Sequence, residues 1–548
     1  MPSVIINGNP IELAAGAKLN GIQAARLGGI EIPHYCWHPG LSVVASCRMC
    51  LVETGTRNPQ TGQIQMLPKL VPACQTPATD NTVFITDSEK VRQARAMVEE
   101  DLLIDHPIDC PICDKAGECL LQDYHFKHGQ AERRADIRPF TSRKRPMGDT
   151  VMLFVDRCVM CTRCTRFTRE IAGTSELMVI NRGADEEIDV FPGHPLANKL
   201  SGCVVDLCPV GALGDRDFLY QQRVWFMQKH EGVCAGCSTG CSVTIEENQD
   251  RIFRLKPREN MQINEWWMCD EGRYSYHHVH SEKRITQPRR REPSGQYVDV
   301  DWSTLVDELH ARLRAVGSGF LAALMSPHLT VEEAYLLATY IRSTDDNARL
   351  VLGPVPETES DEIFKNGFTI RREKCPNRRG VEAILRHFGD AIHHDHVLTF
   401  ENDLFGDVGL MYHGVWVSGG YQTNEWMHEL AKELAEGDLL IAQDLFPSPL
   451  MDVATYQLPG AAFAEREGSY VNHAGILQSF KWAIRPPAGV WTEGQLLWRL
   501  LGRPGMYNAR AVMEEIAAEI PYFAAAAEPV PPTGVALQSA ALHLVSQV

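Results

Sequence analysis

Seventeen cysteines, all but one of them in the first half of a 548-residue chain, constrain this protein more than any other feature of its sequence. They run from Cys36 to Cys269, and only Cys375 lies beyond. Disulfides seldom persist in the cytosol, and residues 1–8 lack the basic segment and long apolar stretch of a signal peptide. Clustered cysteines in a chain of this kind therefore indicate metal ligation in a cytoplasmic protein.

The composition is that of a soluble protein with several domains. Apolar residues make up 44% and charged residues 22% of the chain, and no apolar run reaches the roughly 18 residues of a membrane span. The net charge of −17 argues against nucleic-acid binding, which needs a basic surface. We expect the arginine-rich stretches 133–145 and 284–291 to be solvated linkers or contacts with other subunits.

Hydrophobic periodicity and turn residues predict several elements. We expect a hairpin over residues 3–13, helices near 18–27 and 88–104, and strands at 50–53 and 151–155. Beyond residue 292 the chain alternates between helical and apolar segments, and the runs 319–325 and 439–444 predict buried strands of an α/β region. The Pro- and Ala-rich stretch 524–534 is typical of a tail.

The cysteine spacing defines four ligand sets. The first combines one Cys-x2-Cys pair with two distant cysteines: Cys36, Cys47, Cys50 and Cys74. This arrangement resembles plant-type [2Fe–2S] sites, although its first gap is longer than the usual four residues. A zinc site is the alternative, since four cysteines can also bind Zn²⁺. The asymmetric spacing favours iron–sulfur.

The second set has three cysteines, which leaves a [4Fe–4S] cubane one ligand short: Cys110, Cys113 and Cys119. His106, four residues ahead of Cys110, is the first candidate for the fourth ligand, and His125 and His128 are alternatives. A structural role for His106 is the competing interpretation. Histidine in place of thiolate removes negative charge, which in Rieske centres raises the potential.

The third set follows a Cys-x2-Cys-x2-Cys pattern with a remote Cys-Pro: Cys158, Cys161, Cys164 and Cys208. This is a standard start for one cubane and a poor zinc knuckle. A second cubane is excluded because Thr168 stands where a two-cluster ferredoxin needs cysteine. Cys203 is out of register, and we expect it to be a buried thiol.

The fourth set is Cys-x2-Cys-x3-Cys followed after 27 residues by one more cysteine: Cys234, Cys237, Cys241 and Cys269. The default role of the isolated Cys375 is packing. Four such patterns on one chain indicate an electron relay rather than a single zinc site. The chain has no Gly-x-Gly-x-x-Gly between a strand and a helix, so we expect no NADH site of its own.

Four stretches resemble one known family, the large iron–sulfur subunit of respiratory complex I, which is the G subunit of the bacterial NADH–quinone oxidoreductase. They are CRMCLVE at 47–53, HPIDCPIC at 106–113, CVMCTRCTR at 158–166 and CPVGAL at 208–213. The resemblance implies a [2Fe–2S] cluster on the first set and [4Fe–4S] clusters on the other three, with His106 as a ligand. The fourth set resembles an additional cluster outside the main path, and its pattern also opens molybdopterin oxidoreductases.

The resemblance implies a multidomain protein of mixed α/β and α+β class. The expected parts are a β-grasp [2Fe–2S] ferredoxin domain at 1–85, a helical [4Fe–4S] domain with one histidine and three cysteine ligands at 86–145, a ferredoxin-like [4Fe–4S] domain at 146–225, a molybdopterin-oxidoreductase-type [4Fe–4S] domain at 226–285, and a reduced molybdopterin-oxidoreductase-like α/β region without a metal centre at 286–548. The last part is expected from the stretches 458–465 and 467–472.

The expected function is electron relay within a proton-pumping NADH:quinone oxidoreductase. Electrons would enter from the flavin-bearing subunit, pass through the clusters of the first, second and third sets in that order, and leave towards quinone-proximal subunits. The chain would lie peripherally on the cytoplasmic side of a bacterial inner membrane, with no membrane span and no nucleic-acid partner. The resemblance implies no substrate site in this chain.

Three other functions compete with this one. A molybdenum formate dehydrogenase would need a metal ligand downstream of Cys269; Cys375 is the only cysteine there, and Pro376 follows it, so we expect no molybdenum. An iron-only hydrogenase would need a further cysteine constellation, which the sequence lacks. A zinc-rich scaffold is the non-enzymatic alternative, and iron–sulfur absorbance distinguishes it because zinc sites are colourless.

Overall fold

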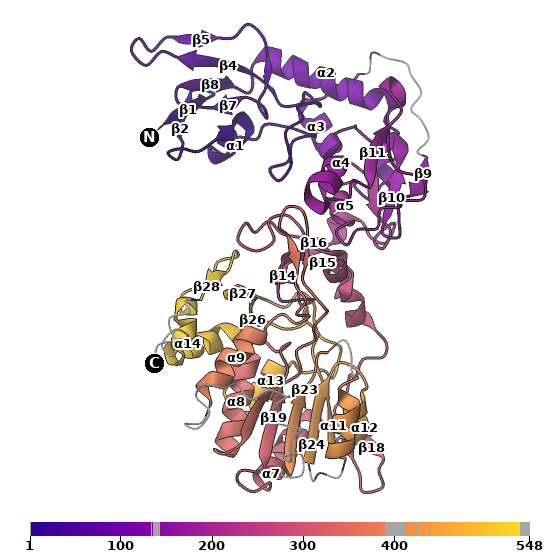
Figure 1. Ribbon diagram of the computed structural model, residues 1–548, viewed down its shortest axis with the longest axis vertical. Coiled ribbons are helices and arrows are strands. Elements are labelled where there is room, and N and C mark those ends of the chain that lie inside the picture. The colour runs from indigo at the N-terminus through magenta and orange to yellow at the C-terminus, as the bar shows by residue number, and fades with distance from the viewer. Residues whose placement is uncertain are drawn as a thin grey trace. The chain divides into compact units, whose positions relative to one another are not determined.

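The computed structural model describes residues 2–132, 134, 143–389, 412–421, 425–435, 437 and 439–537. They form two compact units (Figure 1). The first comprises residues 1–227 with 364–368, and the second comprises 228–363 with 369–548. Most of the arginine-rich stretch 133–145, for which the sequence predicts a linker, lies outside the described residues.

The first unit begins with the predicted hairpin. Strands β1 (Ser3–Ile6) and β2 (Asn9–Glu12) pair antiparallel. Asn7 and Gly8 form the turn with φ of 49° and 84°, a conformation that asparagine and glycine tolerate. The hairpin predicted over residues 3–13 is thus confirmed.

A mixed sheet extends this hairpin in the order β2-β1-β8-β4-β5, with β6 also paired to β4. Its further strands are β4 (Leu51–Arg57), β5 (Ile64–Met66), β6 (Val71–Pro72) and β8 (Thr82–Ile85). A short pair, β3 (Leu19–Asn20) and β7 (Pro77–Ala78), flanks it. Helix α1 (Gly21–Leu27) starts at an Asn20–Gln23 capping box and buries Ile22 in the same core as Phe84.

Helices carry the second cysteine set. Helix α2 (Glu89–Asp105) confirms the helix predicted near 88–104 and is capped by the Ser88 side chain. On this helix the apolar Met97 is exposed, whereas Arg95 and Glu99 are buried. The short 3₁₀ turn Cys110–Ile112 and helix α3 (Leu120–His128) follow.

The third cysteine set lies between a small sheet and two short helices. The sheet has the order β13-β10-β9, from β9 (Lys144–Pro146), β10 (Val151–Phe154) and β13 (Leu213–Asp215). The helices are α4 (Arg163–Phe167), continued by the π-helical turn Thr168–Ala172, and α5 (Cys203–Leu207). A hairpin of β11 (Leu177–Ile180) and β12 (Glu187–Val190) completes this region.

The second unit opens with an antiparallel sheet of β14 (Gln228–Val233), β15 (Ser242–Asn248) and β16 (Arg251–Pro257). A turn of helix α6 (Asp270–Arg273) and the 3₁₀ segment Ser275–His280 follow. The three fourth-set cysteines before residue 242 lie on the connection from β14 to β15, and Cys269 caps α6.

A seven-stranded sheet forms the centre of this unit, in the order β18-β17-β25-β24-β23-β19-β20. Five strands are parallel neighbours: β25 (Tyr456–Pro459), β24 (Leu439–Asp444), β23 (Gly414–Ser418), β19 (Leu321–Met325) and β20 (Arg349–Leu352). Strands β17 (Arg289–Arg291) and β18 (Tyr297–Asp299) form the antiparallel edge. The buried strands predicted at 319–325 and 439–444 are confirmed.

Helices cover both faces of this sheet (Figure 1). Successive residues of a strand point to opposite faces of the sheet, and here both faces are apolar. Leu321 and Ala323 pack into the core on one face, whereas Leu324 packs into the core on the other. On the first face lie α7 (Trp302–Arg314), α8 (Val331–Thr344), α9 (Arg378–His387), α13 (Glu493–Leu500) and α14 (Ala509–Glu519). On the second lie α11 (Met427–Leu434) and α12 (Pro449–Val453).

The stretch that the composition predicts to be a tail is packed instead. Residues Pro521–Ala526 form a 3₁₀ helix in which Phe523 and Ala526 are fully buried. Strand β28 (Val535–Ala536) then pairs with β27 (Ile476–Phe480), which pairs with β26 (Gly468–Val471). The tail prediction for 524–534 is wrong because the stretch is anchored at both ends, by Ala526 in the core and by the strand that follows Gly534, although most of its side chains are exposed. A further pair, β21 (Glu362–Ile363) and β22 (Thr369–Ile370), lies beyond β20.

Candidate metal centres

The first set converges in the loops around β4. The thiol of Cys36 lies within hydrogen-bond reach of Cys47 and Cys74, and these contacts, with backbone N–H groups of the same loop, lower its pKa. The Cys50 thiol is held in the same way by Cys74, which lowers its pKa. The backbone N–H of Tyr35 donates to Sγ of Cys47 at 3.5 Å. The contacts among the thiols also raise the pKa values of the partner thiols Cys47 and Cys74. The four sulfurs therefore share one small site in which their protonation is linked.

The second set lines one cavity of about 20 Å³, together with His106. Helix α2 ends at His106, and Cys119 lies immediately before α3. Burial, and then the charge of Arg157, lower the pKa of His106 to about 4, so its ring is neutral at pH 7 and has a free lone pair. His125 lines a neighbouring pocket that also contains His106, Cys110 and Cys119 but not Cys113. The structure thus brings His106 together with the thiols.

A glycine makes room for this set. A Cβ on Gly211 would lie 2.2 Å from Sγ of Cys113, so only a residue without a side chain fits there. Nη2 of Arg157 pairs with Oδ2 of Asp109 at 2.9 Å, and this holds the loop between His106 and Cys110. The space beside Cys113 and the fixed loop would suit a cluster bound by this thiol.

The third set surrounds a site whose four thiols interact with one another. Burial, and then Cys208, raise the pKa of Cys161 to about 11. Burial and the other thiols also raise the pKa of Cys158 and of Cys164. Protein alone therefore disfavours thiolates here, and bound iron would supply the missing positive charge. Cys203 is buried at the start of α5.

The third set contacts both other sets in the first unit. Nη2 of Arg166 donates to the carbonyl oxygens of Cys36 and Cys161. On the other side, the backbone N–H that follows Cys119 donates to Pro209 O at 2.9 Å. Tyr35 donates through its backbone N–H to Cys47 and through its hydroxyl to Glu99. Its side chain interacts with Cys119 only through space. Segments of the third set thus form direct hydrogen bonds with segments of both the first and the second set. By these contacts the third set links the other two, whereas along the chain the second set is the middle one.

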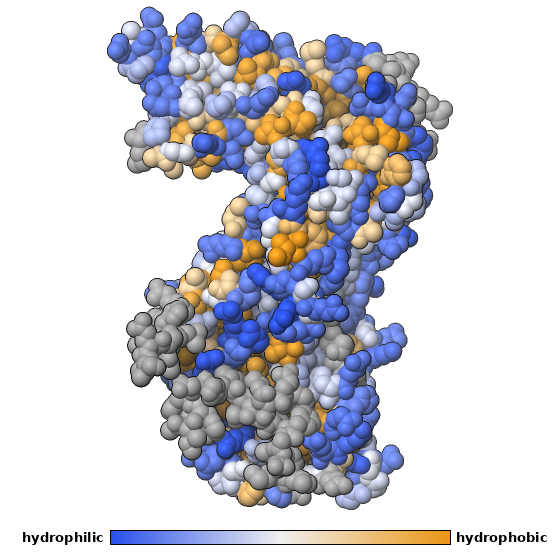
Figure 2. All heavy atoms as spheres, in the orientation of Figure 1, coloured by the Kyte–Doolittle hydropathy of each residue, from blue (hydrophilic) through white to orange (hydrophobic). Residues whose placement is uncertain are grey.

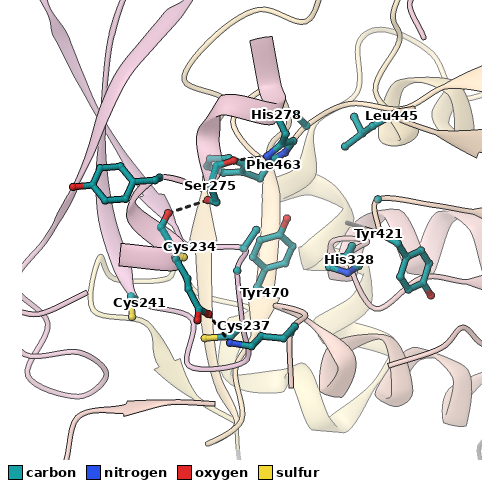
Figure 3. A pocket seen from close by; sticks show the side chains of 18 of the residues that line it. Cys234, Cys237, Cys241, Ser275, His278, His328, Tyr421, Leu445, Phe463 and Tyr470 are labelled. Carbon is teal, nitrogen blue, oxygen red and sulfur yellow. Dashed lines mark hydrogen bonds and ion pairs between the residues drawn. The ribbon is translucent and has the colours of Figure 1, made fainter. Parts of the chain in front are cut away.

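The fourth set lines a cavity of about 620 Å³ in the second unit (Figure 3). Burial and then Cys237 raise the pKa of Cys234 to about 12. The Gly272 N–H donates to Sγ of Cys269 at 3.4 Å. A Cβ on Gly272 would lie 2.8 Å from Sγ of Cys234, so this glycine also makes room beside a thiol. The donor set and the space fit a cluster of several irons.

The cavity also reaches the carboxyl ends of the parallel strands. His328 follows β19, Tyr421 follows β23 and Phe463 follows β25. Figure 3 shows three of the thiols on one side and His328 with Tyr421 on the other. Lys374 lines the cavity and pairs with Glu271 at 2.7 Å. The thiol of Cys375, by contrast, is buried and donates to Glu373.

Among the described residues, no group of three or more His, Cys, Asp or Glu side chains is arranged to hold a single metal ion. The four sets are instead recognised by interactions among their thiols and by the cavities that they share. Sequence reasoning missed Arg163, Arg166 and Gly211, which lie between or against the candidate ligands. The arginines that flank Cys164 were the available signal.

Comparison with known families assigns most of the chain. Five family models match: a 2Fe-2S iron-sulfur cluster binding domain at 3–89, the NADH-ubiquinone oxidoreductase-G iron-sulfur binding region at 95–134, the NADH-quinone oxidoreductase subunit 3 ferredoxin-like domain at 148–214, the molybdopterin oxidoreductase Fe4S4 domain at 227–281, and molybdopterin oxidoreductase at 408–492. Together the five models indicate a chain of mixed α/β structure that contains a 2Fe-2S domain, 4Fe-4S domains and a molybdopterin oxidoreductase domain.

Curated relatives carry related names. The NADH-quinone oxidoreductase G subunit of Rickettsia felis is 33% identical over 342 residues, which are 62% of this chain and 49% of the relative. The NADH-ubiquinone oxidoreductase 75 kDa subunit of Reclinomonas americana is 37% identical over 373 residues, 67% of this chain and 52% of the relative. This chain belongs to the family of the NADH-quinone oxidoreductase G subunit.

The chain spans about half the length of these relatives. The crystal structure of an NAD⁺-reducing [NiFe]-hydrogenase in the H2-reduced state is 25% identical in sequence. The match covers 41% of this chain and 91% of the hydrogenase chain, with a TM-score of 0.34. In the part of this family member that the structure describes, no helix has the length and apolar character of a membrane span.

Proposed function

We propose that this chain is the iron–sulfur electron-relay subunit of an NADH:quinone oxidoreductase. It would receive electrons from a flavin- and NADH-binding subunit and deliver them towards quinone-proximal subunits. The observation that carries the proposal is the third thiol set, which contacts the ligand segments of both other sets within one compact unit. A relay needs neighbouring sites of this kind, and it needs no proton-transfer residue.

The proposed ligands are the four sets. One [2Fe–2S] cluster would be held by Cys36, Cys47, Cys50 and Cys74. Three [4Fe–4S] clusters would be held by His106, Cys110, Cys113 and Cys119; by Cys158, Cys161, Cys164 and Cys208; and by Cys234, Cys237, Cys241 and Cys269. When bound, such clusters accept and release single electrons at potentials set by charge, burial and hydrogen bonds to sulfur.

The contacts favour a path from the first set through the third to the second. This order replaces the one along the chain, in which the site with the histidine ligand would lie in the middle. The fourth set lies in the other unit, and we propose that it serves outside this path. We propose no molybdenum centre and no substrate site in this chain.

The surface near the second set supports a protein partner there. Cys110 is exposed, unlike Cys113 and Cys119. Exposed apolar side chains surround it, with Ile108 66% and Phe126 81% exposed, and Figure 2 shows apolar patches in the area of α3. Exposed apolar patches commonly mark interaction sites. We propose that another subunit of the peripheral arm covers this surface, on the cytoplasmic side of a bacterial inner membrane.

We propose the finer domain organisation stated from the sequence, with a β-grasp domain at 1–85, further cluster domains at 86–145, 146–225 and 226–285, and a reduced molybdopterin-oxidoreductase-like region at 286–548. The mixed sheet that carries α1 supports the first of these. The parallel sheet covered on both faces supports the last.

Iron analysis and EPR test the function. Anaerobically purified chain should contain about 14 iron and 14 acid-labile sulfide per chain. Cys161→Ala should remove one cubane signal from low-temperature EPR and interrupt electron transfer through the assembled complex, whereas Cys375→Ala should leave both unchanged. A colourless preparation that holds zinc, or unchanged spectra and turnover in Cys161→Ala, would overturn the proposal.

A further inference from the structure

Two arginines lie buried between the ligand loops of the first and third sets. Arg163 and Arg166 flank Cys164 on α4. Their exposed fractions are 7% and 3%. Arginine is seldom buried to this degree without a partner, because its guanidinium remains charged in proteins. Their contacts therefore need a physical explanation.

Arg166 joins two ligand residues through one nitrogen atom. Its Nη2 donates to the carbonyl oxygen of Cys36 at 2.5 Å and to that of Cys161 at 3.1 Å. Nε donates to Thr162 O at 3.2 Å, and Nη1 donates to Ser42 O. All four acceptors are neutral backbone carbonyls, so hydrogen bonding is satisfied while the positive charge is left uncompensated.

Arg163 makes a second bridge beside the first. Its Nη2 donates to Trp37 O at 2.6 Å, and its Nη1 donates to Leu207 O at 3.2 Å. Trp37 follows the ligand Cys36, and Leu207 precedes the ligand Cys208. The two arginines thus fix both ends of the contact between the loops of the first and third sets.

The charge of Arg166 has no paired carboxylate among the residues that the structure describes. Glu170 acts on it only through space, and the Glu170 carboxylate binds Arg169 at 2.8 Å and the Ser42 hydroxyl at 2.7 Å. An unpaired buried charge is strongly unfavourable. Besides Glu170, the nearby groups whose negative charge would act on Arg166 are the thiols of Cys36 and Cys161.

We propose that Arg166 is a positioning residue that couples the first and third clusters electrostatically and holds their ligand loops together, with Arg163 as its companion. This inference rests on the proposed function. With both clusters bound, the guanidinium would lie beside two anionic sites at once, and its positive charge would favour the reduced form of each. Its Nη2 also completes a continuous path of covalent and hydrogen bonds from Sγ of Cys36 to Sγ of Cys161, and tunnelling decays more slowly through bonds than through space.

Redox titration of the full chain, followed by EPR, tests this inference. In Arg166→Gln, which removes the charge, we expect the midpoint potentials of both clusters to become more negative together. A fall of about tenfold in each reduction equilibrium constant corresponds to about 59 mV for one electron. Arg166→Lys keeps the charge, so both potentials should stay near those of the unaltered chain. The iron content should be equal in all samples.

Arg169→Gln is the matched control, because Arg169 is three residues away and its side chain is 60% exposed; water screens such a charge. A purely structural role for Arg166 would reduce cluster content without a joint shift of two potentials. The inference is overturned if Arg166→Gln shifts neither potential or only one, or if Arg169→Gln shifts both equally.

If Arg166→Gln loses its clusters, Arg163→Gln removes the companion charge and provides the same readout: a joint negative shift supports the inference and its absence overturns it. The proposed function and this inference can be refuted independently. If the unaltered chain holds no iron and sulfide, the proposed function is overturned and the inference with it, whereas normal clusters with unshifted potentials overturn the inference alone.

Discussion

Gly211 lies directly against the thiol of Cys113, so close that a Cβ on the glycine would lie 2.2 Å from that sulfur. The two residues are almost a hundred positions apart in the sequence, on segments that carry ligands of different sets. The loop after Cys208 therefore belongs to the third set and also forms part of the wall of the second site. Neighbouring sites in this unit share their walls.

Gly211→Ala should therefore displace Cys113 and selectively remove the cluster of the second set. The added methyl group cannot be accommodated without movement of the thiol or of the backbone that follows Pro209. We expect a loss of about four irons per chain and of one cubane EPR signal, measured by iron analysis and low-temperature EPR.

Gly236→Ala is the matched control for this glycine. Its added Cβ would lie 3.6 Å from Sγ of Cys234, an ordinary contact, so all clusters should remain. Full iron content in Gly211→Ala would contradict the prediction, because it would show that the backbone or Cys113 can move to accommodate the methyl group.

His106 should act as a ligand whose replacement tunes the cluster. His106→Ala should lose the cubane of the second set, whereas His106→Cys should retain it at a more negative potential, because a thiolate adds negative charge. Iron analysis and redox titration measure both effects. His125→Ala is the control, because His125 lies outside the small cavity that holds the three thiols. The reverse pattern, with loss only in the His125 variant, would refute the assignment.

The buried carboxyl of Glu332 should make the second unit less stable as pH rises. Its side chain accepts hydrogen bonds from the backbone N–H and hydroxyl of Ser469, each at 2.8 Å. Burial raises its pKa from 4.5 to about 7. Because the folded-state pKa is the higher one, its contribution is fully present below about pH 4.5 and is lost as pH rises through about 7.

Glu332→Gln should remove this loss, on the order of 3 kcal/mol in the free energy of unfolding between about pH 4.5 and 8. The amide can keep both contacts with Ser469 because it has an acceptor and a donor. Chemical denaturation at several pH values measures the slope. The exposed Glu514 provides the control, since Glu514→Gln should leave the slope unchanged; equal slopes for Glu332→Gln and the unaltered chain would contradict the prediction.

Arg284 and Glu465 form an ion pair in the second unit that is almost fully buried, with Nη1 and Oε1 2.5 Å apart. Arg284→Met should reduce the free energy of unfolding by about 3–5 kcal/mol, because it leaves the Glu465 charge buried without its partner. The double variant Arg284→Met with Glu465→Gln should recover part of this loss. Denaturant titration of the unaltered chain, of both single variants and of the double variant measures it, and additive effects of the two substitutions would argue against the pairing.

Local patterns were the most predictable part of this protein. The hairpin at the start needs only the Asn7-Gly8 turn between two apolar runs, and Ser88 is a good cap for the helix that follows it. The buried strands around Leu321 and Leu439 are continuous apolar runs of suitable length. The prediction for 524–534 is wrong because alanine-rich composition does not show whether a core lies beside it.

The sequence by itself determined which close cysteines belong together, because Cys-x2-Cys spacing holds its cysteines on one loop in any fold. It also placed His106 four residues ahead of Cys110. Only the tertiary structure decided which sets are neighbours: Arg166 contacts Cys36 across 130 positions, and Gly211 meets Cys113 across a comparable distance in the sequence. Such contacts depend on how separate segments pack, and residue spacing along the chain carries no information about that packing.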